Sequence, residues 1–165
     1  MAKFHIPITV EGKYFSQVGE LVTRWGWIEN QSGVLIRELL RIKKPEGYMA
    51  IGNMGIQAKT RVIAALARHH FSGKQMEKDF ENLTTAIQKF DDFRNNVVHG
   101  LWVYYPKDTT DHALVTRKKL QLEVDPTPDK DILTHLPRKI QQLLDIQNEA
   151  QRLTRAIKAL RGKFS

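Results

Sequence analysis

The sequence predicts an all-α fold, a four-helix bundle with a small β-hairpin insert before the last helix. In four segments, apolar residues recur at three- and four-residue spacing, which is typical of a helix with one buried face. Between the third and fourth segments the pattern changes to the alternation expected of strands. At 165 residues, the chain is long enough for a single domain, over residues 1–165, with a core of its own.

The first helix is predicted over residues 14–43. Its buried face is expected to hold the apolar residues Val18, Leu21, Val22, Trp25, Ile28, Leu35, Leu39 and Ile42. Gly26 and Gly33 weaken the helix and could bend it. A loop with three glycines follows, at Gly47, Gly52 and Gly55. It lacks the Gly-Lys-Ser/Thr ending of a phosphate-binding loop, so it is interpreted as a connector.

The second and third helices are predicted over residues 56–71 and 74–99, with a break at Ser72-Gly73. In the second helix, the residues expected to point inward are Val62, Ile63, Leu66 and Ala67, and those expected outside are Lys59, Arg61 and Arg68. In the third, the apolar stripe consists of Phe80, Leu83, Ile87, Phe90 and Val97. Gly100 follows, as is common just beyond a helix C-terminus.

The β insert is predicted over residues 101–125. Residues 102–105 and 113–116 are mostly apolar or aromatic and flank a polar turn, which favours a hairpin. Leu120, Leu122 and Val124 then alternate with polar residues. Pro126 and Pro128 end this region, and the fourth helix is predicted over residues 132–160.

Charge and composition narrow the class of protein. The formal net charge of +8 favours an anionic partner, which could be nucleic acid, an anionic membrane surface or an acidic protein. With no cysteine in the chain, disulfides, thiolate nucleophiles and cysteine-based zinc sites are excluded. The first residues lack the apolar stretch of a signal peptide, and no window is apolar enough to span a bilayer. A soluble, cytoplasmic protein without membrane association is therefore expected.

The third helix ends in the pattern most informative about function, Arg-Asn-Asn-Val-Val-His-Gly at residues 94–100. Arginine is a permanent planar cation suited to phosphate, and histidine moves protons near neutral pH. Because Asn95 and His99 are four residues apart, they share one face of the helix. Together with the basic charge, this combination points to chemistry on RNA.

Arg94 falls on the apolar stripe of its helix, where an arginine needs a partner or a pocket. Glu29 lies at the edge of the inner face of the first helix and is the predicted partner. Purely structural explanations stay open. His99 before a glycine is favourable at any helix C-terminus, and Arg94 with an inner acid could be a structural ion pair.

Residues 94–100 resemble the arginine–four-to-six-residues–histidine motif of HEPN (higher eukaryotes and prokaryotes nucleotide-binding) domains. The motif lies on a late helix of a predicted four-helix bundle, as in that family, and Glu29 is similar to an acidic position on an earlier helix of some HEPN-like families. In one branch of HEPN toxins a tyrosine stands two residues after the histidine. This chain has Leu101 there, so the regulation tied to that tyrosine is not expected.

The resemblance implies a metal-independent endoribonuclease without a cofactor, with RNA as its partner. HEPN ribonucleases are often homodimers in which two motifs meet, and many serve as toxins or in phage defence, which implies an antitoxin or regulatory protein as a further partner. Arg94, His99 and Asn95 are the candidate catalytic residues, with Glu29 in support. The alternatives are a non-catalytic HEPN-like module that binds nucleotide, RNA or protein, and a structural helical adaptor.

Basic residues outside the motif are candidates for RNA contacts. These are Lys118 and Lys119, and the series Arg152, Arg155 and Lys158 on one face of the last helix. Such a series is either a solvated helix face or a track for RNA phosphates. The neighbouring carboxylates Asp91 and Asp92 lack a third acid at useful spacing, so no metal site is predicted.

Overall fold

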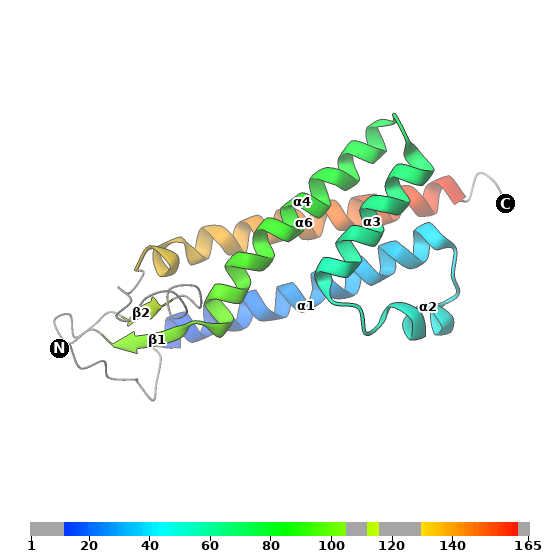
Figure 1. Cartoon of the computed structure of the whole chain (residues 1–165). Coiled ribbons are helices and arrows are strands. Elements are labelled where there is room, and N and C mark those ends of the chain that lie inside the picture. Colours follow the sequence, from blue (N-terminus) through cyan, green and yellow to red (C-terminus); the bar gives the residue numbers. More distant parts are fainter. Residues whose placement is uncertain (1–11, 105–111, 116–129, 162–165) are drawn as a thin grey trace. The chain divides into compact units, whose positions relative to one another are not determined.

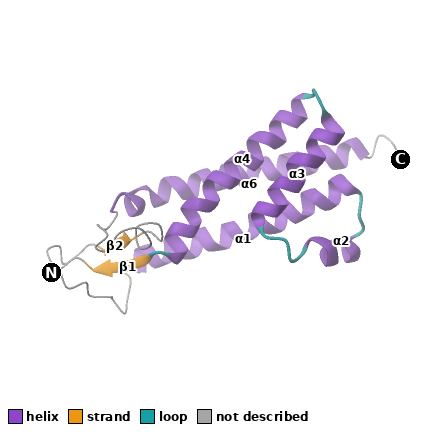
Figure 2. Cartoon of the chain, viewed as in Figure 1, coloured by secondary structure: helices purple, strands orange, loops and turns teal. Residues whose placement is uncertain are grey.

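The computed structural model describes residues 12–104, 112–115 and 130–161 of the chain. Within them lie five α-helices and a pair of short β-strands (Figure 1). Helices account for most of the described residues (Figure 2), so the predicted predominance of α-helix is confirmed. None of the described helices is long and apolar enough to cross a membrane.

The chain forms two compact units. One comprises Met1–Thr23 and Asp91–Gln142, and the other comprises Arg24–Phe90 and Leu143–Ser165. Three helices contribute to both units: α1 (Gly12–Leu40), α4 (Gln75–His99) and α6 (Lys130–Arg161). The residues predicted to be functional are divided between the units. The motif from Arg94 to His99 lies in the first unit and Glu29 lies in the second.

Helix α1 is continuous through Gly26 and Gly33 and ends at Leu40, three residues before the predicted end. The next residue, Arg41, has a left-handed backbone with a φ of 57°, which stops the helix. Five of the residues predicted to point inward are buried: Leu21, Trp25, Ile28, Leu35 and Leu39. The prediction for Val22 is wrong, since 46% of this residue is exposed.

A short helix, α2 (Lys44–Ile51), occupies most of the segment that the sequence analysis interprets as a connector. Pro45 lies in its first turn, where a missing N–H costs nothing, and Glu46 in the same turn complements the helix dipole. Gly47 is buried, and a side chain there would collide with the stem of Arg37. The glycine therefore serves close packing of α2 on α1 rather than chain flexibility.

Helix α3 (Ile56–Phe71) has the predicted bounds, and α4 begins one residue later than predicted. Gly73 between them adopts a left-handed φ of 73°, which favours glycine. Its backbone N–H donates to Glu77 Oε2 at 2.7 Å, and the rings of Phe71 and Phe80 stack with centroids 5.9 Å apart. The predicted apolar stripe of α4 is confirmed, because all of its residues are buried: Phe80, Leu83, Ile87, Phe90 and Val97.

The strands β1 (Leu101–Tyr104) and β2 (His112–Val115) pair antiparallel, with Leu101 opposite Val115 and Tyr104 opposite His112. The alternating residues predicted to extend the insert, from Leu120 to Val124, lie outside the described residues. Helix α6 begins two residues before its predicted start and continues through Pro137.

The second unit, Arg24–Phe90 with Leu143–Ser165, is held together by apolar packing and a few polar contacts between helices. Trp25 of α1 stacks on Phe90 of α4 with ring centroids 5.8 Å apart. Gln31 of α1 donates to the hydroxyl of Thr154 in α6 at 2.8 Å. These contacts join segments more than sixty residues apart in sequence.

Candidate active site

Arg94 lies in the last two turns of α4, and its side chain is 18% exposed. Its Nη2 atom is 3.5 Å from Oδ1 of Asp91, whose side chain is 6% exposed. Residues three apart on a helix are neighbours, so this ion pair follows directly from the local sequence. The expectation that a mostly buried arginine has an acidic partner is met by Asp91, a residue for which the sequence analysis assigns no such role. The i, i+3 spacing was the signal that could have identified it.

His99 is the last residue of α4 and is exposed, and Asn95 lies one turn before it, half-buried. A basic side chain in the last turn complements the partial negative charge at a helix C-terminus. Exposure leaves the imidazole accessible to a substrate. The helix thus carries a fixed, mostly buried cation and an accessible proton carrier at the same end.

Helix geometry separates the directions of Arg94 and His99. At about 100° per residue, positions five apart point about 140° away from each other, with a rise of about 7.5 Å along the axis. The two side chains therefore do not emerge on one side of the helix. A single phosphate contacted by both residues requires the long reach of arginine or residues from a second copy.

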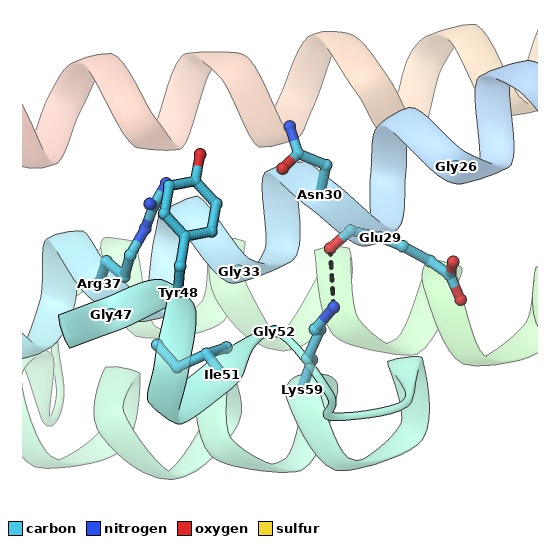
Figure 3. Close-up of a pocket in the computed structure, with 10 residues that line it drawn as sticks. All are labelled: Gly26, Glu29, Asn30, Gly33, Arg37, Gly47, Tyr48, Ile51, Gly52 and Lys59. Carbon is cyan, nitrogen blue, oxygen red and sulfur yellow. Dashed lines mark hydrogen bonds between the residues drawn. The ribbon is translucent and has the colours of Figure 1, made fainter. Parts of the chain in front are cut away.

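Glu29 projects from the middle of α1 and lines a cavity in the other compact unit. Its backbone carbonyl accepts a hydrogen bond from Lys59 Nζ at 3.3 Å, while its carboxylate points away from that ammonium group (Figure 3). The ion pair predicted between Glu29 and Arg94 would join residues of different units, and it stays a prediction.

The basic residues considered for RNA contacts differ in their surroundings. Lys118 and Lys119 lie outside the described residues. Arg155 and Lys158 are exposed on α6. Arg152 is also exposed but donates to Asp79 at 2.6 Å and to both carboxylate oxygens of Glu149 at 2.7 and 2.8 Å. Because Asp79 and Glu149 occupy donors on both Nε and Nη2 of Arg152, this residue is a weaker candidate for a phosphate contact than its neighbours.

The hydrogen bonds around Asp79 also affect its ionisation. Hydrogen bonds from Gln75 and then from Arg152 hold the pKa of the Asp79 carboxyl below its ordinary value of 3.8. A carboxyl with a lowered pKa in the folded state stabilises the fold above its ordinary pKa, and the contribution is lost as the pH falls through the folded value. At neutral pH the Asp79–Arg152 pair is therefore intact, which supports a structural role for Arg152.

The neighbouring carboxylates Asp91 and Asp92 lie in different surroundings. Asp91 is buried beside Arg94, whereas Asp92 is exposed. In the part of the chain that the structure describes, no three His, Asp or Glu side chains are grouped so that they could hold a metal ion.

Comparison with known proteins found no match among family models, curated proteins or solved structures. The resemblance to HEPN domains therefore rests on the motif at residues 94–100 and on the order of the predicted elements.

Proposed function

We propose that the protein is a metal-independent endoribonuclease of HEPN type that cleaves RNA through the substrate's own 2′-hydroxyl. The observation that carries the proposal is the end of α4, where Arg94 is held beside the buried carboxylate of Asp91 and the helix finishes on an exposed histidine, His99. A fixed cation for the phosphate and an accessible proton carrier are the two elements that this reaction needs.

The reaction is an attack of the 2′-oxygen on the adjacent phosphorus. The bond between O2′ and phosphorus forms, the bond between phosphorus and the 5′-oxygen of the next nucleotide breaks, and the products are a 2′,3′-cyclic phosphate and a 5′-hydroxyl. One proton leaves the 2′-hydroxyl and one is delivered to the departing 5′-oxygen. No side-chain nucleophile is needed, and DNA is resistant because it lacks the attacking hydroxyl.

Each motif residue has a role in this route. His99 takes or delivers a proton, and the guanidinium of Arg94 neutralises charge that develops on the phosphoryl oxygens. Asn95, one turn from His99, orients the imidazole or donates to the same phosphate. Asp91 acts through Arg94 by keeping its guanidinium in place, so we assign it as a positioning residue.

The proposal includes a homodimer in which two motifs face each other, within a HEPN-like four-helix bundle that carries the β insert. Because Arg94 and His99 point about 140° apart on one helix, we assign each catalytic centre to Arg94 of one protomer and His99 of its partner. A role as a toxin or in phage defence, with an antitoxin or other regulatory protein as partner, belongs to the same proposal.

The test is incubation of the purified protein with mixed RNAs, and separately with single-stranded DNA, in EDTA. Cleavage of RNA and not of DNA is the expected result. Equal cleavage by the wild type and by Arg94→Ala and His99→Ala variants would identify a contaminating nuclease. If no RNA is cleaved, the result favours the alternative function, a non-catalytic module that binds nucleotide, RNA or protein.

Asp91→Asn is expected to lower the turnover number for RNA by about tenfold, because a guanidinium without its fixed carboxylate stabilises the transition state less well. Asparagine has nearly the same shape, so the packing around residue 91 is kept. Steady-state kinetics on a single RNA, with a thermal melt of each variant, measure the effect. Asp92→Asn is the matched control, since Asp92 is exposed. An equal loss in both variants, or a loss only in proportion to a lowered melting temperature, would remove the positioning role of Asp91.

Glu29→Gln is expected to keep the fold yet weaken RNA cleavage, because the predicted pair with Arg94 loses its charge. Since Lys59 donates to the backbone carbonyl of Glu29, the substitution leaves that hydrogen bond in place. Cleavage rates are compared with those of Glu20→Gln, which changes an exposed acid on the same helix. Wild-type cleavage by Glu29→Gln would show that Glu29 does not support Arg94.

A further inference from the structure

A cavity of about 300 Å³ lies in one compact unit, between α1, α2 and the start of α3 (Figure 3). Four of its lining residues are glycines, two from α1 and two from the region of α2: Gly26, Gly33, Gly47 and Gly52. Its charged lining residues are Arg37, Lys59 and Glu29, and Asn30 and Tyr48 add neutral polar groups. The cavity is in the unit that does not contain Arg94 and His99.

Arg37 is the most unusual residue of this cavity, because it is only 7% exposed. Its guanidinium carbon lies 4.3 Å from the centroid of the Tyr48 ring, a cation–π contact. Its Nη1 atom is buried without a hydrogen-bond partner, and no carboxylate of the described residues is within ion-pair distance of the guanidinium. A buried guanidinium without an anion is costly, so a binding role is a better explanation than a structural one.

Lys59 brings a second cation to the same cavity and is 8% exposed. The helical pattern predicts that this lysine lies on the outer face of α3, and that prediction is wrong. Its ammonium group donates to the carbonyl of Glu29 at 3.3 Å. An ammonium group has three donors, and this is the single hydrogen bond that the described residues provide, so two donors remain for a ligand.

The charges of the cavity do not cancel. Two buried cations line it with one carboxylate, that of Glu29, which leaves an excess of one positive charge. In Figure 3 the Glu29 carboxylate points away from both Arg37 and Lys59. The Glu29 carboxylate therefore does not shield either cation from an anion that enters the cavity.

Gly47 positions Arg37 in this arrangement. A Cβ at residue 47 would collide with Cγ and Cδ of Arg37, so the glycine is required for α2 to lie against the stem of that side chain. With its stem covered by α2, the guanidinium remains beside the Tyr48 ring and lines the cavity.

We propose that this cavity binds a small molecule through its phosphate group, with Arg37 and Lys59 as the phosphate ligands. A guanidinium donates two parallel hydrogen bonds to phosphate oxygens, and an ammonium group adds a point charge with free donors. The volume is that of a small metabolite rather than of a folded polymer. Glu29 lines this cavity and is also the predicted support of Arg94, but the phosphate proposal rests on Arg37 and Lys59, which have no role in the proposed RNA cleavage.

Isothermal titration of the full-length protein with ribose 5-phosphate, inorganic phosphate and ribose tests the proposal. Both phosphates bind saturably and ribose does not. Arg37→Met and Lys59→Met each weaken phosphate binding by about tenfold or more, since each removes charge-assisted hydrogen bonds. Arg61→Met, which removes an exposed cation two residues from Lys59, leaves binding unchanged.

A second measurement keeps the proposal testable if one variant folds poorly. Without ligand, Arg37→Met should melt at the same or a higher temperature than the wild type, because an apolar side chain replaces a buried, unpaired cation. Gly47→Ala should instead weaken phosphate binding by displacing the Arg37 stem.

Three results would overturn the proposal. The first is that neither phosphate binds saturably. The second is that both methionine variants bind phosphate as the wild type does. The third is that the protein binds a short RNA but neither small phosphate, and that Arg37→Met loses the RNA binding. The last result would assign the cavity to a nucleic-acid backbone. Because Arg37→Met is expected to cleave RNA at the wild-type rate, failure of this site and failure of the proposed ribonuclease are distinguishable.

Discussion

His99→Ala is expected to lower the rate of RNA cleavage by about 10²- to 10⁴-fold, the range for loss of a general acid or base. His99 is exposed at the end of α4, so its removal disturbs no packing. His99→Gln, which keeps a polar side chain of similar size but cannot carry the proton, should be equally impaired. Single-turnover cleavage of one labelled RNA measures the loss.

Arg94→Ala is expected to reduce the rate by about 10²- to 10³-fold, because the cation that faces the developing phosphoryl charge is removed. This variant also removes the ion-pair partner of the buried Asp91 carboxylate, so a thermal melt must accompany the assay. Arg94→Lys separates the two effects, since it keeps the charge but loses the planar fork. Wild-type rates for a folded Arg94→Ala or His99→Ala protein would exclude the motif from catalysis.

Mixing Arg94→Ala with His99→Ala protein is expected to restore activity that neither variant has alone. In a symmetric dimer whose centres each combine Arg94 of one protomer with His99 of the other, every mixed dimer has one intact centre. Random exchange of subunits therefore restores about a quarter of wild-type activity, because half of the dimers are mixed and one of the two centres in each mixed dimer is intact.

The control for this experiment is a mixture of the wild type with a variant that carries both Arg94→Ala and His99→Ala. In this mixture none of the mixed dimers has an intact centre. Subunit exchange is verified by mass spectrometry of differently tagged chains. A dimer whose mixed variants stay inactive would show that Arg94 and His99 act within one chain, and a monomer at micromolar concentration by light scattering would remove the shared centre altogether.

The helices were largely predictable because their sequence patterns are long and local. In α4, five apolar residues at three- to seven-residue spacing, from Phe80 to Val97, define one face, and all five are buried. The break before α4 was predictable from Ser72-Gly73, because a left-handed φ favours glycine. These features depend on neighbours within one or two turns of the chain.

Features that depend on distant segments were not predictable. The glycines at 47 and 52 favour a loop when considered locally, but Gly47 is in a helix whose position depends on Arg37 of α1. Lys59 falls on the polar side of its helical pattern, yet α1 covers it and supplies the carbonyl that it contacts. Tertiary contacts override local propensity in both cases.

The candidate site is an intermediate case. The position of Arg94 on an apolar stripe was sufficient to predict that it has a partner, and Asp91 three residues earlier is such a partner. To predict Glu29 as the partner of Arg94, one must know how α1 and α4 face each other. The periodicity within each helix does not give that information. The proposed centre shared by two protomers likewise cannot be derived from the pattern of one chain.

In the proposed reaction the substrate's 2′-hydroxyl is the nucleophile and no metal takes part. The most direct test uses an RNA oligonucleotide with one mapped cleavage site, and a copy with a single 2′-deoxy nucleotide on the 5′ side of that site, both incubated with the protein in EDTA. We expect cleavage of the RNA to a 2′,3′-cyclic phosphate and a 5′-hydroxyl, identified by mass spectrometry, and no cleavage of the 2′-deoxy copy at that position. Cleavage of the 2′-deoxy copy at the same position, or products that carry a 5′-phosphate, would contradict the proposed reaction.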